Sequence, residues 1–282
     1  MSARLVVPVH FPDLTERSAL KLAAVLPTVA RAHFARWHAR MGRAERAERI
    51  FTPLVHVEVA VTDVPIDPSS RLRISGRSRL GRVLDTAGEI RMLVREGAWR
   101  VAAADGREVA RARLVNAFAR DDEDPARRRV TELPTGFGLG SRPSRVVEVP
   151  GTADLVPETR SPDLTDRAER VWHYGQTDPN RHVNASAYLR SLEEFAATEL
   201  HRLGHDLRRA YPRRARLVYR KPCFRGQPYR RVGWLVGEAP LVVAAAVVPP
   251  GAGARPAVAA ELSYALHPAL RSGSEGSGPP SA

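Results

Sequence analysis

Cysteine and long apolar runs are both scarce in this chain of 282 residues. Its single cysteine, Cys223, excludes an internal disulfide and fits a reducing compartment, so we expect a cytoplasmic protein. No apolar run reaches the length of about 18 residues that a membrane-spanning helix needs. The apolar stretch near the N-terminus is also too short for a secretory signal peptide. We therefore expect neither a membrane span nor export.

Lysine is almost absent, although the formal net charge is +13. Lys21 and Lys221 are the only lysines, so arginine supplies nearly all of the positive charge. From Arg208 to Arg231 there are ten basic residues and no acidic one, with four aromatic residues among them: Tyr211, Tyr219, Phe224 and Tyr229. Such a segment could bind nucleic acid, the acidic surface of an acyl carrier protein, or the phosphates of coenzyme A.

The segment Thr177–Asn184 carries a carboxylate, an amide and an imidazole at alternate positions: Asp178, Asn180 and His182. In an extended chain, alternate side chains point to the same side. A helix is predicted to start directly afterwards, and a helix start offers free backbone N–H groups that stabilise an oxyanion. The segment therefore predicts a base, a hydrogen-bond donor and a proton-tunable group beside an anion site, which suits attack on a carbonyl.

These residues also resemble a known family. The run Asp-Pro-Asn-Arg-His-Val-Asn at 178–184, with Tyr188 and Leu192-Glu193 after it, resembles the D-x-N-x-H-V-N-N-x-x-Y motif of acyl-ACP thioesterases. It is also similar to the shorter motif of 4-hydroxybenzoyl-CoA thioesterases, whose aspartate falls on Asp178. Both families have the hotdog fold, a long helix wrapped by a curved antiparallel sheet. The resemblance implies an α+β chain of tandem hotdog domains that hydrolyses a thioester.

The predicted elements agree with two such domains. Residues 1–120 read as an N-terminal hotdog without the motif: a helix over about 14–41, kinked at Pro27, and strands over 4–10, 54–62, 70–79, 88–95, 99–104 and 108–119. Residues 121–167 read as a linker, and 271–282 as a disordered tail. Residues 168–270 read as a C-terminal hotdog with the motif: a helix over 185–203 and strands over 168–174, 213–221, 230–237, 241–248 and 257–266.

The resemblance implies a role for each residue of the motif. Asp178 would be the general base or nucleophile, Asn180 would bind the thioester oxygen or orient water, and His182 would hold its neighbours or pass a proton to the leaving thiolate. Each of them could instead be an ordinary turn or loop residue. We expect Asn184 to cap the helix and Tyr188 to belong to an apolar helical stripe. The predicted substrate-binding residues are Asn184, Tyr188, Arg213, Arg214, Arg216, Arg220 and Cys223.

The sequence departs from the family at one position. Plant acyl-ACP thioesterases carry an Arg-Glu-Cys stretch on the strand after the helix, and the glutamate there is implicated in activating water. The matching passage here has Pro222 in place of the glutamate, followed by Cys223. Either Asp178 acts as the base, as in the 4-hydroxybenzoyl-CoA type, or the chemistry differs. Cys223 fits a small buried residue better than a nucleophile.

We predict hydrolysis of an acyl thioester, on a carrier protein in preference to coenzyme A, with no metal or redox cofactor. Three alternatives stay open. A hotdog hydratase or dehydratase would have its histidine five residues after the aspartate, whereas His182 follows Asp178 by four. A non-catalytic acyl- or carrier-binding protein is favoured by Pro222, and a nucleic-acid binder by charge alone. The fused pair could also form a homodimer, and the type of acyl chain is open.

Overall fold

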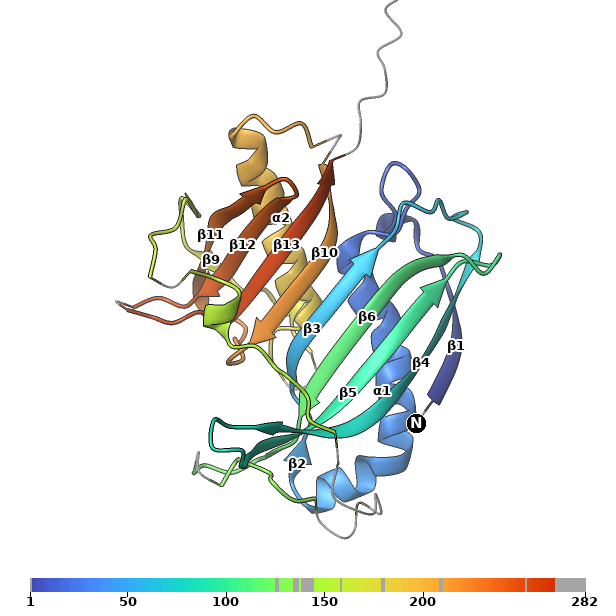
Figure 1. Cartoon of the computed structure of the whole chain (residues 1–282), viewed down its shortest axis with the longest axis vertical. Helices are drawn as coiled ribbons and strands as arrows, with labels where there is room; N and C mark the ends of the chain where they lie inside the picture. The colour runs from blue at the N-terminus through green and yellow to red at the C-terminus, as the bar shows by residue number, and fades with distance from the viewer. Residues whose placement is uncertain are drawn as a thin grey trace, which may run out of the picture.

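The computed structural model describes residues 2–124, 127–133, 137, 145–157, 159–178, 181–207, 210–251 and 253–266. Two long helices, α1 (Leu22–Ala47) and α2 (Ala185–Arg202), lie on the same side of a large antiparallel sheet (Figure 1). Each helix and the strands wrapped around it form one hotdog, so the predicted tandem hotdog fold is confirmed.

Within the described residues the sheet has 11 strands. Its order is β1 (Ser2–Pro8), β4 (Arg71–Leu84), β5 (Ile90–Ala102), β6 (Glu108–Ala117), β3 (Leu54–Val61), β10 (Ala210–Tyr219), β13 (Val258–Leu266), β12 (Leu241–Val248), β11 (Pro228–Glu238) and β8 (Leu164–Thr165). The short strand β9 (Arg170–Val171) also pairs with β11, and a separate ladder joins β2 (Ile50–Phe51) to β7 (Ala119–Arg120). The first half supplies β1 to β6 and the second half β8 to β13, so the halves meet where β3 pairs with β10.

The seam between β3 and β10 carries a buried histidine. In His56, Nδ1 lies 2.9 Å from the carbonyl oxygen of Leu217 on β10, and Nε2 lies 2.9 Å from Oε1 of Glu58. Each ring nitrogen therefore faces an acceptor oxygen, one on either side of the seam. Hydrogen bonds from His56 and Arg113 lower the pKa of the Glu58 carboxyl to about 2, which keeps this acceptor charged.

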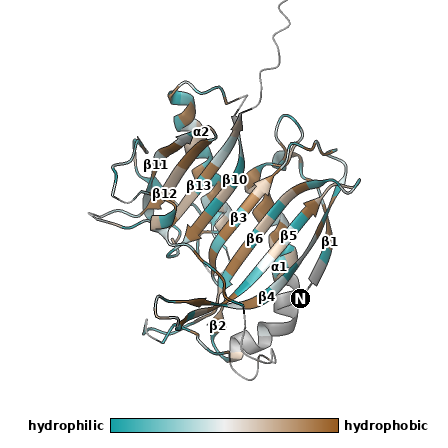
Figure 2. Cartoon of the chain, viewed as in Figure 1, coloured by the Kyte–Doolittle hydropathy of each residue, from teal (hydrophilic) through white to brown (hydrophobic). Residues whose placement is uncertain are grey.

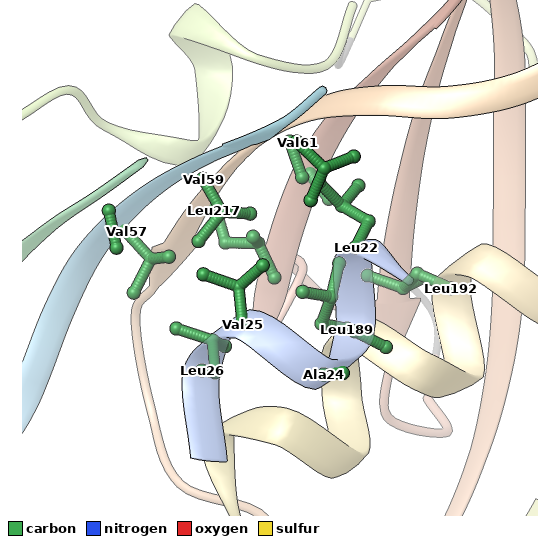
Figure 3. Packing of buried hydrophobic residues seen from close by; sticks show 14 of the residues in the cluster. Leu22, Ala24, Val25, Leu26, Val57, Val59, Val61, Leu189, Leu192 and Leu217 are labelled. Carbon is green, nitrogen blue, oxygen red and sulfur yellow. The ribbon is translucent and has the colours of Figure 1, made fainter. Parts of the chain in front are cut away.

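One hydrophobic core runs through both hotdogs. Figure 3 shows Leu22 and Val25 of α1 close to Leu189 of α2, beneath Val57 of β3 and Leu217 of β10, and all five side chains are buried. Each such side chain contributes about 1.5–3 kcal/mol when it leaves water. The strands beyond the seam are apolar as well; β12 reads LVVAAAVV, and it lies in the brown part of the sheet in Figure 2.

The predicted linker crosses the face of the sheet that the helices leave open (Figure 1). Val147 packs on Val83, Val94 and Val115, and farther along Leu155 and Val156 pack on the outer side of the second hotdog. The linker range also contains β8 and the 3-10 helix Thr152–Asp154. The division at residues 120 and 168 stays a prediction, and the tail 271–282 lies outside the described residues.

The first helix differs from its prediction at both ends. It begins at Leu22 instead of near residue 14, because Oγ1 of Thr15 accepts hydrogen bonds from the backbone N–H groups of Arg17 and Ala19 and holds a turn there. It also continues through Gly42 to Ala47, with Pro27 inside it. Several predicted strands also differ from the structure. β4 continues to Leu84 instead of ending at 79, and β10 is shifted to Ala210–Tyr219 from the predicted 213–221. β5 is one strand over the predicted pair 88–95 and 99–104, and only Arg170–Val171 forms a strand within 168–174.

No described helix combines the length and the apolar character that a membrane crossing requires.

Candidate functional site

The motif forms a tight turn. The backbone N–H of Asp178 donates to the carbonyl of His182 at 2.8 Å, and the N–H of Arg181 donates to the carbonyl of Asp178 at 2.9 Å. Arg181 has a φ of 65°, in the left-handed region, and Thr177 pairs with Val183 as an isolated bridge. The extended conformation expected for this segment is therefore wrong, because an Asp-Pro pair favours a turn.

The turn still brings Asp178 and His182 together, because their backbones face each other across it. The carboxylate of Asp178 also accepts a hydrogen bond from the backbone N–H of His182, at 3.3 Å. Both side chains are half-buried. Asn180 lies outside the described residues, so its predicted role stays a prediction.

The helix start beside the turn is capped as expected. Asn184 is the N-cap of α2, and its Oδ1 accepts from the backbone N–H and the hydroxyl of Ser186 at 2.9 and 2.8 Å. The N–H of Ala187 donates to the carbonyl of Asn184. Among the described residues, the backbone N–H of Ala185 is therefore the one donor in the first turn of α2 without an acceptor. Ala185 directly follows the motif.

A cluster of three aromatic side chains lies next to the elements that hold the turn. The ring of Trp172 stacks on Tyr229 at 4.0 Å between centroids, and its edge meets Tyr188 at 5.0 Å. The Oη of Tyr188 accepts from the backbone N–H of Cys223 at 2.8 Å. Burial raises the pKa of Tyr188, so this hydroxyl stays neutral. Tyr188 is 2% exposed and lies in the core, where it ties α2 to the loop between β10 and β11.

That loop lies against the motif, as the resemblance implies. The N–H of Val183 donates to the carbonyl of Cys223 at 2.9 Å, and His182 forms a bridge with Phe224. Pro222, which stands in place of the family's glutamate, therefore lies next to the turn and brings no carboxylate to it. Burial raises the pKa of the Cys223 thiol, so the cysteine fits a buried packing residue better than a thiolate nucleophile.

A polar cleft of about 570 Å³ opens beside the start of α2. It lies between β9, the 3-10 helix Tyr174–Gln176, α2 and β11, and its lining includes His173, Gln176, Thr177, Asn184, Arg190 and Tyr229. Thr177, directly before the motif, and Asn184, its last residue, line the cleft, whereas Asp178 and His182 do not. Within the described ranges, no three His, Cys, Asp or Glu side chains come close enough together to hold a metal ion.

The structure does not gather the four predicted arginines into one site. Arg213 reaches across the seam to Asp63 and to the carbonyl of Thr62. Arg216 pairs with Glu261 at 3.6 Å on the exposed side of β10, where Arg214 is also exposed. Arg220 donates to the carbonyls of residues 255 and 256.

A buried ion pair was missed in the sequence. The guanidinium of Arg231 donates from Nε and NH2 to the two carboxylate oxygens of Asp166, both at 2.8 Å, and from NH1 to the carbonyl of Ser191 on α2. Burial alone would raise the pKa of the Asp166 carboxyl, but the hydrogen bonds from Arg231 outweigh it and hold this pKa low. The sequence pattern that could have indicated this buried arginine is the alternation of β11, in which Arg231 falls on the same buried side as Tyr229 and Gly233.

Glu193 lies away from the motif, on the side of α2 that meets α1. Burial raises its pKa to about 7, although the backbone N–H of Ala23 and the charge of Lys21 oppose this shift. Because this pKa is raised above the ordinary value of 4.5, the stability linked to Glu193 is fully present below about pH 4.5 and is lost as the pH rises through 7.

Replacing Glu193 should therefore remove its contribution to the pH dependence of the free energy of unfolding. We expect Glu193→Gln to exceed the wild type in free energy of unfolding by up to about 3 kcal/mol at pH 8, and by little at pH 4. Urea unfolding at pH 4 to 8 measures this difference. Glu194→Gln, one position along on the exposed side, is the control and should parallel the wild type. Parallel curves for Glu193→Gln would show that its carboxyl is already ionised in the folded protein at neutral pH.

Neither a protein-family model nor a curated protein matches the sequence. Solved structures do match. A putative oleoyl thioesterase from Lactobacillus plantarum has a TM-score of 0.72 at 13% identity, over 95% of this chain and 96% of its own. The 12:0-ACP thioesterase from Umbellularia californica gives 0.68 at 14%, over 94% of each chain, and an acyl-ACP thioesterase from Bacteroides thetaiotaomicron gives 0.67 at 13%, over 94% of this chain and 98% of its own. This chain therefore has, over nearly its whole length, the tandem hotdog fold of acyl-ACP thioesterases.

Proposed function

We propose that this protein hydrolyses an acyl thioester to a free acid and a thiol. The observation that carries the proposal is the turn at the start of α2, which sets Asp178 opposite His182 beside a polar cleft. The thioesterases with the same fold add support, since each of them spans nearly the same length. An acyl carrier protein is the preferred carrier of the acyl group, and coenzyme A is the alternative.

In the proposed mechanism Asp178 takes a proton from water, whose oxygen attacks the thioester carbon. The Ala185 N–H at the positive end of α2 stabilises the oxyanion, with Asn180 as a second donor. The carbon–sulfur bond then breaks, and the proton passes to the thiolate through His182. Asp178 has this role alone because Pro222 supplies no second carboxylate.

Release of free thiol tests the proposal. The purified protein is incubated with acyl carrier proteins and coenzyme A esters that carry short, long, branched and aromatic acyl groups, and a thiol reagent follows turnover. We expect hydrolysis of at least one carrier-linked substrate, faster than that of the matching coenzyme A ester. Absence of turnover on every substrate, together with binding of acyl carrier protein, would instead identify a non-catalytic binding protein and give Pro222 as the reason.

A further inference from the structure

Three loops meet at one edge of the second hotdog, around the motif. They are the 3-10 helix Tyr174–Gln176, the motif turn, and the loop over 220–227 between β10 and β11. Backbone hydrogen bonds fasten them together: Val183 donates to Cys223 at 2.9 Å, and Gly226 donates to Trp172 at 3.0 Å. We call the outer side of these three loops the rim.

The rim exposes aromatic side chains. Tyr174 is 77% exposed and Phe224 39%, and Val171 beside them is 45% exposed. The ring of Phe224 lies edge-on to His182 at 5.0 Å, and the guanidinium of Arg225 lies 5.8 Å from the centre of the Tyr174 ring. Aromatic and arginine side chains in this combination are enriched where proteins bind each other. Because Phe224 contacts His182, the rim lies directly beside the motif.

The rim also carries positive charge that the protein does not neutralise. Arg181, Lys221 and Arg225 are exposed, and none of them forms an ion pair with a described residue. Elsewhere in the basic segment, acidic partners are common: Arg213 with Asp63, Arg216 with Glu261, Arg230 with Glu169 and Arg231 with Asp166. Apart from Arg214, the unpaired charge of the described part of that segment is therefore on the rim.

We propose that the rim docks an acyl carrier protein, whose acidic surface sets its charges against Lys221 and Arg225 and an apolar side chain against Tyr174 and Phe224. Two arguments favour this partner. Its negative charge complements the rim, and a protein that covers the rim holds the acyl group it carries next to the motif turn. The identity of the partner as a carrier rests on the proposed function. This assignment moves the docking surface from Arg213, Arg214 and Arg216 to the neighbouring loops.

Charge reversal separates the two surfaces. Lys221→Glu/Arg225→Glu changes the rim, and Arg214→Glu/Arg216→Glu makes the same change in charge on the exposed side of β10. Binding of an acyl carrier protein is measured by calorimetry with the acyl group attached through an amide, which cannot be hydrolysed. We expect the rim variant to bind at least about tenfold more weakly and the control to stay within about twofold. Added salt should weaken binding of the wild type and bring it towards the rim variant.

Binding and turnover are read separately, so failure of one proposal does not conceal failure of the other. Loss of binding in the rim variant supports the docking surface even if no substrate is hydrolysed. Equal loss in both variants, loss only in the control, or no binding by the wild type would overturn it. Salt-sensitive binding of a random-sequence oligonucleotide that exceeds binding of the carrier and disappears in the rim variant would assign the rim to nucleic acid.

Discussion

Asp178→Asn should lower kcat by about 10²- to 10⁴-fold on the best thioester substrate, because it removes the only base that the proposed mechanism has. The fold should persist, since an asparagine oxygen can accept from the backbone N–H of His182 as the aspartate does. The free energy of unfolding should therefore change by no more than about 0.5 kcal/mol. Thiol release and urea unfolding on the same preparation measure both quantities.

Glu169→Gln is the matched control for this variant. Glu169 is exposed and lines the polar cleft beside the motif turn, so the same chemical change is made close to the site without touching that turn. Its kcat should stay within about twofold of the wild type, as expected for a surface change. Full activity of Asp178→Asn would remove Asp178 from the mechanism, whereas equal losses in both variants would show that negative charge near the start of α2 matters more than a base.

Arg231→Met should destabilise the protein by up to about 3–5 kcal/mol, because the buried carboxylate of Asp166 loses both hydrogen bonds from the guanidinium and keeps those from Arg170 and from the backbone N–H of residue 231. Arg231 is 4% exposed and Asp166 8%, so water cannot replace the lost hydrogen bonds. The same change also removes the hydrogen bond to the Ser191 carbonyl and the contact with the ring of Phe195. Urea unfolding at pH 7 should report a lower midpoint with an unchanged slope.

The double variant Arg231→Met/Asp166→Leu distinguishes the burial of an unpaired charge from the loss of packing. With both charges removed, we expect it to recover at least half of the lost free energy of unfolding, since an apolar pair of similar volume often replaces a buried ion pair at little cost. If the double variant is as unstable as Arg231→Met, the hydrogen bond to α2 carries the effect and the pairing with Asp166 does not.

Elements with a strong local pattern could be predicted from the sequence. The cap at Asn184 and the apolar stripe of α2 place that helix within a residue of where the structure has it, and β12 matches its prediction at both ends. Such elements are set by neighbouring residues: a cap, a period of 3.6 or 2, and a turn residue such as Gly204 after the helix.

Features that depend on distant or competing contacts were not predictable in this way. The start of α1 shifted because the side chain of Thr15 offers the backbone an alternative to the helix. The partner of Arg231 lies 65 residues away, so no local pattern marks it. At the motif, the residue types suggested the chemistry, but the left-handed Arg181 closes a turn that an alternating pattern does not reveal.

The pairing of β3 with β10 has a consequence for synthesis. β3 lies between β6 and β10, with Val57 paired to Leu217 of β10. During translation β6 is made soon after β3, whereas β10 is made only when most of the chain has been synthesised. About 100 residues separate the end of β6 from the end of β10, so at a translation rate of roughly 5–20 residues per second β10 follows on the order of five to twenty seconds later. During that time the first hotdog presents an open strand edge and an uncovered apolar side of α1, which are the features that favour pairing with the wrong chain. Having both hotdogs in one polypeptide limits that exposure, because the correct partner strand emerges from the same ribosome.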